Sequence, residues 1–482
     1  MRRKNKKDKI NIITFFANIP TFIYILPIVI LQNFLFDPAG FWEHITSYTL
    51  SFFLLIVFGA FSAADYRTKK YKTLPDQASV KEGILFQKKF SLPYDKLQSV
   101  IIQSSPFTML FSAVKIQLNT AATKAKKGDA VFYLSKENAK RLITEIYDDI
   151  GYIHRYYHAK NSRIFLMAAI WSNPVSGFLI LSPVVNNIGK IVGSELKTQL
   201  ISSFDFSKYL VYIGISPTTA FIAYFLIVCY LVSVAADFFR TSNFTCTAYQ
   251  KGIVIKRGII RKTLFFTNPS KLNAITINSS IFMIPLRLCS AYIYTVGAGK
   301  PKGDRSLLIA AERKKTVKHL LEMLFPDLDF NFSLKTRPAP NSIRNFLRLP
   351  LYVMSGLAAA LILLSRLGVS EWIIVRSGIF AAAGCVLWCF FRVAAFRNSE
   401  LLANERFVYV KSFRRITLRS TLIPIDKIQF CIKRVGRFQQ KNCAVRIYIY
   451  GEKRTFVQIK HLSQSSADRF LNLINRQLST KQ

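Results

Sequence analysis

The sequence has few of the residues from which metal and catalytic sites are built. Its 482 residues include seven cysteines and five histidines. The cysteine number is odd and no Cys-x-x-Cys pair occurs, so neither a disulfide framework nor a zinc ribbon is indicated. Cys385 and Cys389 lie four apart in an apolar run, where small buried packing residues are a better interpretation than a site. We expect reduced, structural cysteines, and no cofactor.

The histidines and the glycine-rich runs also lack the spacing that chemistry requires. His154 and His158 in YIHRYYHAK could bracket a metal on a helix, but no carboxylate lies between them. Tyr156 and Tyr157 favour an aromatic position at a membrane interface instead. The run VGAGKPKGD, residues 296–304, is not a Walker A loop because Pro301 follows Gly-Lys where Ser or Thr is needed. The sequence therefore predicts neither an enzyme nor a metal protein.

Acidic residues are scarce, whereas basic and apolar residues are abundant. The chain has 26 Asp and Glu against 67 Lys and Arg, a net charge of +41, and 51% hydrophobic residues. Its mean hydropathy is +0.24. A nucleic-acid-binding protein is basic but has no need of long apolar runs. Clustered apolar and basic stretches are typical of a membrane protein with cytoplasmic domains.

Six apolar runs are candidates for transmembrane helices, since a bilayer core needs about 20 mostly apolar residues. Asn173-Pro174 interrupts the third run and Pro217 the fourth, and Arg376 lies within the sixth. They form three pairs: residues 10–31 and 48–64, 164–185 and 209–236, 350–364 and 372–391.

The distribution of charge predicts the orientation. The segment MRRKNKKDK precedes the first run, which is too long for a signal peptide. The loop at residues 32–47 contains Asp37 and Glu43 but no Lys or Arg. Basic segments remain in the cytoplasm. We therefore expect a multi-pass protein of the bacterial plasma membrane, with its N-terminus and large polar segments cytoplasmic.

One motif occurs three times. LPYDKLQSVIIQSS begins at Leu92, TNPSKLNAITINSS at Thr267 and IPIDKIQFCIKRV at Ile423. The shared lysines, Lys96, Lys271 and Lys427, are 175 and 156 residues apart. This spacing is too long for a solenoid unit, which recurs about every 20 to 50 residues. It predicts whole domains repeated in tandem, with the motif acting as a turn that enters a strand.

Each polar segment is predicted to be rich in strands and to end in a helix. Hairpins are expected to turn at Gly83 and Gly258, whereas the third copy has Lys411-Ser412-Phe413 instead of a glycine turn. Strands follow the motif and recur at 114–118, 291–296 and 445–450. Amphipathic helices are expected at 136–147, 311–325 and 466–478.

This order of elements resembles the bacterial pleckstrin-homology (PH) family, in particular the multi-copy YdbS/YdbT-like membrane proteins. The motif is clearest in the first and third copies, and the middle copy departs from it with Asn-Pro-Ser-Lys-Leu-Asn. The resemblance implies a membrane protein of mixed α and β structure with six transmembrane helices in three pairs. A PH-like small β-barrel or sandwich, closed by a C-terminal helix, would follow each pair. The implied divisions are 1–64 (basic segment and pair 1), 65–162 (PH-like domain 1), 163–236 (pair 2), 237–348 (PH-like domain 2), 349–391 (pair 3) and 392–482 (PH-like domain 3).

Three basic hairpin tips are the candidate binding residues. Each lies between the last two predicted strands of a copy. Basic residues near an anionic membrane each contribute about 1 kcal/mol to binding, although simple solvated tips are the alternative. The candidate contacts for anionic lipid or a partner are Lys124, Lys126, Lys127, Lys300, Lys302, Lys453 and Arg454.

Two functions remain open. The first is a non-enzymatic membrane scaffold whose PH-like domains bind anionic lipid headgroups or a related membrane protein, in a cell-envelope role. The second is a transporter or channel component, since repeated helix pairs occur in such proteins. Transport pathways usually carry ionisable residues at mid-depth, and only Arg376 lies inside a predicted span. We favour the scaffold, and no nucleic acid is expected as a partner.

Overall fold

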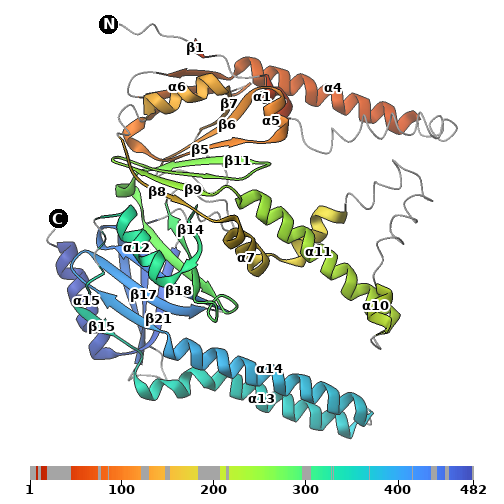
Figure 1. Cartoon of the computed structure of the whole chain (residues 1–482), viewed down its shortest axis with the longest axis vertical. Coiled ribbons are helices and arrows are strands. Elements are labelled where there is room, and N and C mark those ends of the chain that lie inside the picture. Colours follow the sequence, from red (N-terminus) through yellow and green to blue (C-terminus); the bar gives the residue numbers. More distant parts are fainter. Residues whose placement is uncertain are drawn as a thin grey trace. The chain divides into compact units, whose positions relative to one another are not determined.

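The chain forms two compact units, residues Met1–Asn268 and Pro269–Gln482. Each is considered by itself (Figure 1). The computed structural model describes residues 7–8, 12–18, 45–73, 77–84, 86–120, 130–146, 152–182, 207–212, 216–295, 306–326, 328, 330–367, 370–414, 416–435, 442–450 and 455–479.

The first unit begins with a four-stranded antiparallel sheet in the order β1-β2-β3-β4. Its first strand lies before the predicted transmembrane pair and its other three strands lie after it. The hairpin between β3 and β4 turns at Gly83, whose positive φ of 109° confirms the predicted glycine turn. The bounds are β1 Lys7–Asp8, β2 Lys70–Thr73, β3 Gln77–Glu82 and β4 Lys88–Pro93.

The second sheet of this unit has seven antiparallel strands in the order β7-β6-β5-β11-β10-β9-β8. Strands from two predicted domains therefore share one sheet, with β5 beside β11 (Figure 1). The predicted closing helix is present as α6, Lys136–Ile146. The strands are β5 Leu97–Ser104, β6 Ala113–Thr120, β7 Ala130–Ser135, β8 Ile153–His158, β9 Thr245–Tyr249, β10 Ile253–Arg257 and β11 Lys262–Thr267; the five-residue helix α5, Pro106–Leu110, follows β5.

The second unit contains another seven-stranded sheet, in the order β14-β13-β12-β18-β17-β16-β15. A separate three-stranded sheet, β19-β20-β21, follows it. The predicted closing helices are α12, Lys314–Leu324, and α15, Gln464–Ser479. The strands are β12 Ala274–Ser280, β13 Leu288–Tyr294, β14 Ser306–Arg313, β15 Leu334–Thr336, β16 Glu400–Ala403, β17 Phe407–Arg414, β18 Thr417–Pro424, β19 Ile428–Val435, β20 Asn442–Ile449 and β21 Thr455–Ser463.

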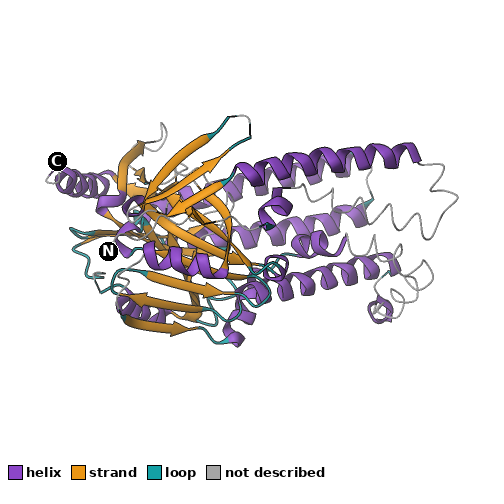
Figure 2. Cartoon of the chain, turned by 90° about the horizontal axis from the view of Figure 1, so that it is seen from above, coloured by secondary structure: helices purple, strands orange, loops and turns teal. Residues whose placement is uncertain are grey.

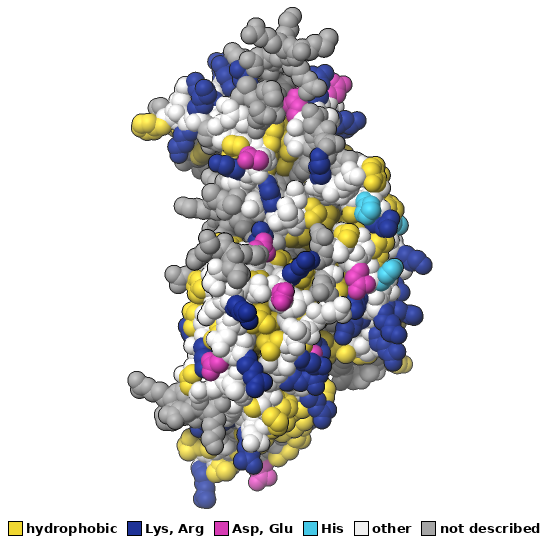
Figure 3. Space-filling view, turned by 90° about the vertical axis from the view of Figure 1, so that its left-hand side faces the viewer, with side chains coloured by type: hydrophobic (Ala, Val, Ile, Leu, Met, Phe, Trp, Pro, Cys, Tyr) yellow, Lys and Arg dark blue, Asp and Glu magenta, His cyan; other side chains and the backbone are white. Residues whose placement is uncertain are grey.

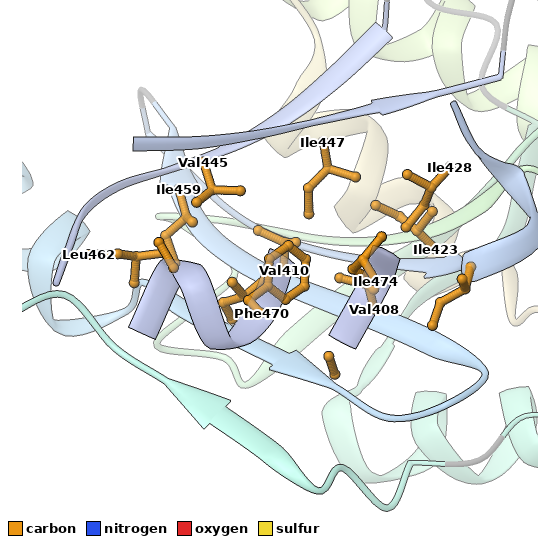
Figure 4. Packing of buried hydrophobic residues seen from close by; sticks show 14 of the residues in the cluster. Val408, Val410, Ile423, Ile428, Val445, Ile447, Ile459, Leu462, Phe470 and Ile474 are labelled. Atoms are coloured by element: carbon orange, nitrogen blue, oxygen red, sulfur yellow. The ribbon is translucent and has the colours of Figure 1, made fainter. Parts of the chain in front are cut away.

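Each unit has an apolar core between its sheets and a closing helix. In the first, Tyr71 of β2 stacks on Phe132 of β7 with ring centroids 4.6 Å apart, which joins the two sheets. In the second, Phe470 and Ile474 of α15 point between strands of both sheets (Figure 4). Phe470 is completely buried. Two packed sheets closed by a helix agree with a PH-like fold. Among the described strands, the sheets do not close into a barrel.

Among the described residues, three helices are long and apolar enough to cross a membrane: Pro217–Thr241, Pro340–Arg366 and Ile374–Arg397. They correspond to α11 (Pro217–Thr241), α13 (Ile343–Arg366) and α14 (Glu371–Arg397), and within their own units they extend away from the strands (Figure 2). A fourth span is possible in composition if Asn161–Trp171, which is α7, and Pro174–Ser182 count as one, although they meet at 91°. Helix α4, Ile45–Thr68, covers the predicted run 48–64.

Two sequence expectations about the helices need revision. The run 164–185 is not a straight helix, because the chain bends at the interruption that Asn173-Pro174 marks. The run 209–236 is divided between α10, Ser207–Tyr212, and α11, which begins at Pro217. Proline favours the first turn of a helix, where no intrahelical partner for its missing N–H is lost. The first run, 10–31, lies mostly outside the described residues, apart from α1, Ile13–Asn18, and the six-helix arrangement stays a prediction.

The third copy forms its hairpin without a glycine. Strand β17 runs through Lys411-Ser412-Phe413, where a turn was expected, and pairs with β18 up to Arg414 opposite Thr417. Only residues 415–416 separate those partners, whereas residues 83–87 separate Glu82 from Lys88 in the first copy. The third hairpin is therefore closed by a shorter connection, and that connection contains no glycine.

Candidate functional site

All seven predicted binding residues lie outside the described residues. Strands β6 and β7 pair antiparallel, as do β13 with β14 and β20 with β21. The hairpins that were expected to carry the tips are therefore present. The tips themselves, with Lys124, Lys126, Lys127, Lys300, Lys302, Lys453 and Arg454, are not described.

The repeated motif is a single turn of 3-10 helix. It spans Tyr94–Lys96, Pro269–Lys271 and Ile425–Lys427 in the three copies. In the first copy the Leu97 N–H donates to the Tyr94 carbonyl oxygen, and in the third the Ile428 N–H donates to that of Ile425. The turn ends one sheet and starts the next, so the interpretation of the motif as a folding signal agrees with the structure.

The strand that follows each turn is also the strand that joins neighbouring copies. Strand β5 pairs with β11 of the next copy, and β12 pairs with β18 in the same way. We call these two strand pairs the joints. Both joints have the same register. A residue that lies n positions after the motif lysine of its own copy is opposite the residue that lies n + 1 positions before the motif lysine of the next copy. Thus Ser99 faces Thr267, and Ile275 faces Leu422.

The joints contribute to the cores beside them. Phe266 of β11 is buried in the core of PH-like domain 1, and Ala274 of β12 is buried in that of domain 3. The Thr267 hydroxyl donates to the Gln98 carbonyl oxygen at 3.0 Å. Within the second unit the Asn273 side chain donates to the Tyr450 carbonyl oxygen at 2.8 Å. Sequence analysis did not predict the joints. The signal that could have indicated them is the constant distance, along the sequence, between the apolar strands and the motif lysine.

One edge strand of each seven-stranded sheet comes from the end of a predicted domain and pairs with the first strand of the next one. Strand β8 lies within residues 65–162 but pairs with β9, and β15 lies within 237–348 but pairs with β16. In both cases the predicted helix pair lies between the two strands in the sequence. The domain boundaries stay a prediction, but the pairing shows that each helix pair is inserted into a sheet.

In the second copy the glycine turn lies against the end of a candidate membrane helix. The Gly258 N–H donates to the Ser242 carbonyl oxygen at 2.7 Å, and the Ile259 N–H donates to that of Phe239 at 3.0 Å. Gly258 has a φ of 95°, and a Cβ there would lie 2.0 Å from the Arg261 carbonyl oxygen of the same turn and 3.2 Å from the Arg240 carbonyl oxygen of α11. The turn therefore depends on glycine to reach the last residues of α11.

This turn exposes apolar side chains beside basic ones. Ile259 and Ile260 are 41% and 53% exposed, and Lys256 and Lys262 are exposed on the adjoining strands. The first copy is similar, since Phe86 in the turn between β3 and β4 is 84% exposed. Lys and Arg are also more frequent than Asp and Glu on the face shown in Figure 3. Exposed apolar residues with basic neighbours are typical of segments that contact anionic membranes.

The third copy places its hairpin near a membrane helix as well. Phe413 of β17 stacks with Phe391 of α14, with ring centroids 6.3 Å apart. Ile416 at the end of that hairpin is 46% exposed. In both units, therefore, a hairpin of a PH-like sheet is fixed to the strand-side end of a long apolar helix.

Polar contacts hold the bent helix against α11. The Ser172 hydroxyl donates to the Asp237 carboxylate at 3.0 Å, and the Ser176 and Ser233 hydroxyl oxygens are 2.6 Å apart.

Arg376, the ionisable residue inside the sixth predicted run, stacks on the Trp372 ring with its guanidinium carbon 3.5 Å from the centroid. This cation–π contact lies in the first turns of α14, near its end rather than at mid-depth.

The described residues hold no group of three or more His, Cys, Asp or Glu placed to bind a metal ion. His154 and His158 lie on β8, a strand, so the helical spacing considered for a metal does not apply. Tyr157 between them is buried and packs edge-on against Phe244.

Burial raises the pKa of the Cys246 thiol to about 12, so that thiol is protonated at neutral pH.

The comparisons with known proteins agree with this architecture. The family described as Bacterial PH domain matches residues 17–150. This match spans a little more than a quarter of the chain, and together with the long apolar helices it supports a membrane-associated protein with a bacterial PH domain. The chain is similar to the UPF0699 transmembrane protein YdbT of Bacillus subtilis (strain 168), with 24% identity over 326 residues. This region is 61% of the present chain and 65% of that relative. The predicted resemblance to YdbS/YdbT-like PH-domain membrane proteins is thereby confirmed.

Proposed function

We propose that this chain is a non-enzymatic membrane scaffold whose PH-like domains bind anionic lipid at the cytoplasmic surface of the bacterial plasma membrane. The observation that carries the proposal is the glycine turn of the second copy. It is hydrogen-bonded to the end of α11 and exposes Ile259 and Ile260 between basic residues. Apolar residues at such a position insert at the headgroup boundary, and basic residues attract anionic headgroups.

The joints support a scaffold because each one pairs strands of neighbouring copies within a single sheet. A strand pair with packed side chains leaves little freedom between the elements it connects. In the first unit the joint would therefore hold the turns of the first and second copies at one membrane surface, and their weak contacts would add in avidity. The seven basic tip residues remain candidates for further contacts of the same kind. A related membrane protein remains a candidate partner.

The proposal is tested on the full chain, since the sheets are shared between domains. Lys256→Gln combined with Lys262→Gln removes two charges at the glycine turn. The matched control is Lys140→Gln combined with Arg141→Gln, which removes two charges from α6. Because each basic residue contributes about 1 kcal/mol near an anionic surface, we expect the turn variant to lose most of its bound anionic lipid.

The measurement is the amount of anionic lipid retained by the purified protein after exchange into mixed-lipid nanodiscs, at low and at high salt. The native chain should be enriched in anionic lipid, and added salt should weaken the enrichment. The control should behave as the native chain does. Equal retention by the turn variant and the native chain would refute lipid binding at this turn.

Transport is the second candidate function, and the 91° bend between Asn161–Trp171 and Pro174–Ser182 is the observation that favours it. Interrupted helices form substrate sites in many transporters. The polar contacts of the bend, however, join it to α11 through Ser172 and Ser176. Ion or solute flux in proteoliposomes that depends on Asp237 would favour transport over the scaffold.

A further inference from the structure

The three strands that follow the repeated turn are equivalent, and within the part of the chain that the structure describes two of them are in a joint. Strand β5 lies between β6 and β11, and strand β12 lies between β13 and β18. Strand β19 follows the third turn, and among the strands that the structure describes it pairs with β20 alone. Its other edge is therefore not occupied by any described strand. An unpaired edge presents backbone N–H and C=O groups to a further strand.

The equivalence of β19 and β5 is supported by an irregularity that both contain. In β5 the register with β6 shifts between Leu97 and Ser99, and in β19 the register with β20 shifts between Ile428 and Phe430. Both shifts begin one residue after the motif lysine. The backbone of β19 is thus prepared in the same way as that of a strand already in a joint.

The side chains of β19 are more exposed than those of β5. Phe430 and Val435 of β19 are 44% and 48% exposed, whereas the residues at the equivalent positions of β5, Ser99 and Ser104, are 0% and 9% exposed. Phe430 stacks on Tyr448 of the neighbouring strand, with centroids 4.4 Å apart. Positions that are buried in a strand belonging to a joint are therefore exposed in β19 and carry apolar side chains there, which is a feature of surfaces that receive a strand.

The chain contains one equivalent strand that could fill this edge, β4, which is the last strand of its own sheet. The register common to both joints would place Arg434 opposite Lys88 and Lys433 opposite Lys89. Like charges directly opposite in a sheet are destabilising. Neither existing joint contains such a pair among its directly opposed residues. The sequence therefore opposes pairing of β19 with β4, whether from this chain or from a second copy.

We propose that β19 receives an antiparallel strand from a different protein, with an acidic residue opposite Arg434 and no basic residue opposite Lys433. Lys433 already has an acidic partner, because its ammonium group lies 2.6 Å from the Asp468 carboxylate. The exposed Arg434 therefore selects the partner by charge, while Phe430 and Val435 supply apolar contact. This inference rests on the proposed scaffold role, since it gives the scaffold a protein partner in addition to lipid.

The experiment measures binding of two fluorescent peptides to the full chain in nanodiscs of neutral lipid. The first peptide has the sequence of residues 86–95, and the second carries Lys88→Glu and Lys89→Glu. We expect the acidic peptide to bind at least about tenfold more tightly, because two like-charge pairs become opposite-charge pairs. Neutral lipid makes this readout independent of anionic lipid, so failure here and failure of lipid binding are distinguishable.

A charge exchange on the protein gives the decisive comparison. Arg434→Glu should weaken binding of the acidic peptide and strengthen binding of the native peptide. The control Arg469→Glu makes the same change on an exposed position of α15 and should leave both affinities unchanged. Equal binding of the two peptides, or no effect of Arg434→Glu, would overturn the proposal. Tighter binding of the native peptide would overturn it too, in favour of a second copy of this chain.

Discussion

Gly177 is the position at which the smallest change should have a large effect. It lies in Pro174–Ser182, one residue after the Ser176 contact with α11. A Cβ placed on it would lie 1.6 Å from the carbonyl oxygen of Cys229, whereas real Cβ contacts are not shorter than 3.0 Å. In Gly177→Ala the two backbones must therefore separate by about 1.4 Å. Small residues permit such close approach between membrane helices.

The expected cost is that of an overpacked interface, about 1–3 kcal/mol. Rotation of a side chain cannot relieve it, because the opposing atom belongs to the backbone of α11. Separation would also stretch the hydrogen bond that the Tyr230 hydroxyl donates to the Ala169 carbonyl oxygen. We therefore expect Gly177→Ala to lower the temperature at which the detergent-solubilised protein aggregates by several degrees, measured by size-exclusion chromatography after heating.

Gly356→Ala in α13 is the matched control. Nothing lies within 4 Å of the Cβ it would introduce, and alanine is the better helix former by about 1 kcal/mol. The control should be neutral or slightly stabilising. If Gly177→Ala and Gly356→Ala aggregate at the same temperature, the close approach of the bent segment to α11 is wrong.

Two further predictions concern pH and orientation. Burial, together with the nearby Lys460 and Arg392, lowers the pKa of His461 below 6.5, so the folded state disfavours protonation. The contribution of neutral His461 to the free energy of unfolding should be fully present above a pH of about 6.5 and decrease below it. The variant His461→Asn should reduce this pH dependence in thermal unfolding, and asparagine tolerates the positive φ of 62° at this position. A membrane-impermeant thiol reagent added to intact cells should label a cysteine introduced at Asp37 and not one at Lys300; labelling at Lys300 would invert the proposed orientation.

Local sequence patterns predicted most elements of the PH-like domains. Helix α12 was expected from the apolar stripe of Val317, Leu320, Leu321 and Leu324; Leu320 is half-buried and the other three are buried. The turns at Gly83 and Gly258 were expected from glycine at a break in alternation, and both residues have positive φ. These features depend on neighbours within a few residues, which is the range that periodicity and turn chemistry describe.

The bend of the third apolar run was only partly predictable. Asn173-Pro174 marked the interruption, because the residue before proline is biased away from helical conformation. The sequence did not predict the angle of 91° at this bend. It is set where Gly177 meets the backbone of α11 and where Ser172 bonds to Asp237, residues that are distant in the sequence.

The sequence by itself determined where strands, turns and closing helices form, and that the motif recurs three times. Only the tertiary structure decided which strands are neighbours: that β11 joins β5, that β18 joins β12, and that β8 and β15 pair with β9 and β16 as edge strands of the two seven-stranded sheets. The physical reason is that strand edges pair through backbone N–H and C=O groups, which every residue except proline carries alike. Side-chain patterns fix which face of a strand is buried, but packing across the whole chain selects the partner at its edge.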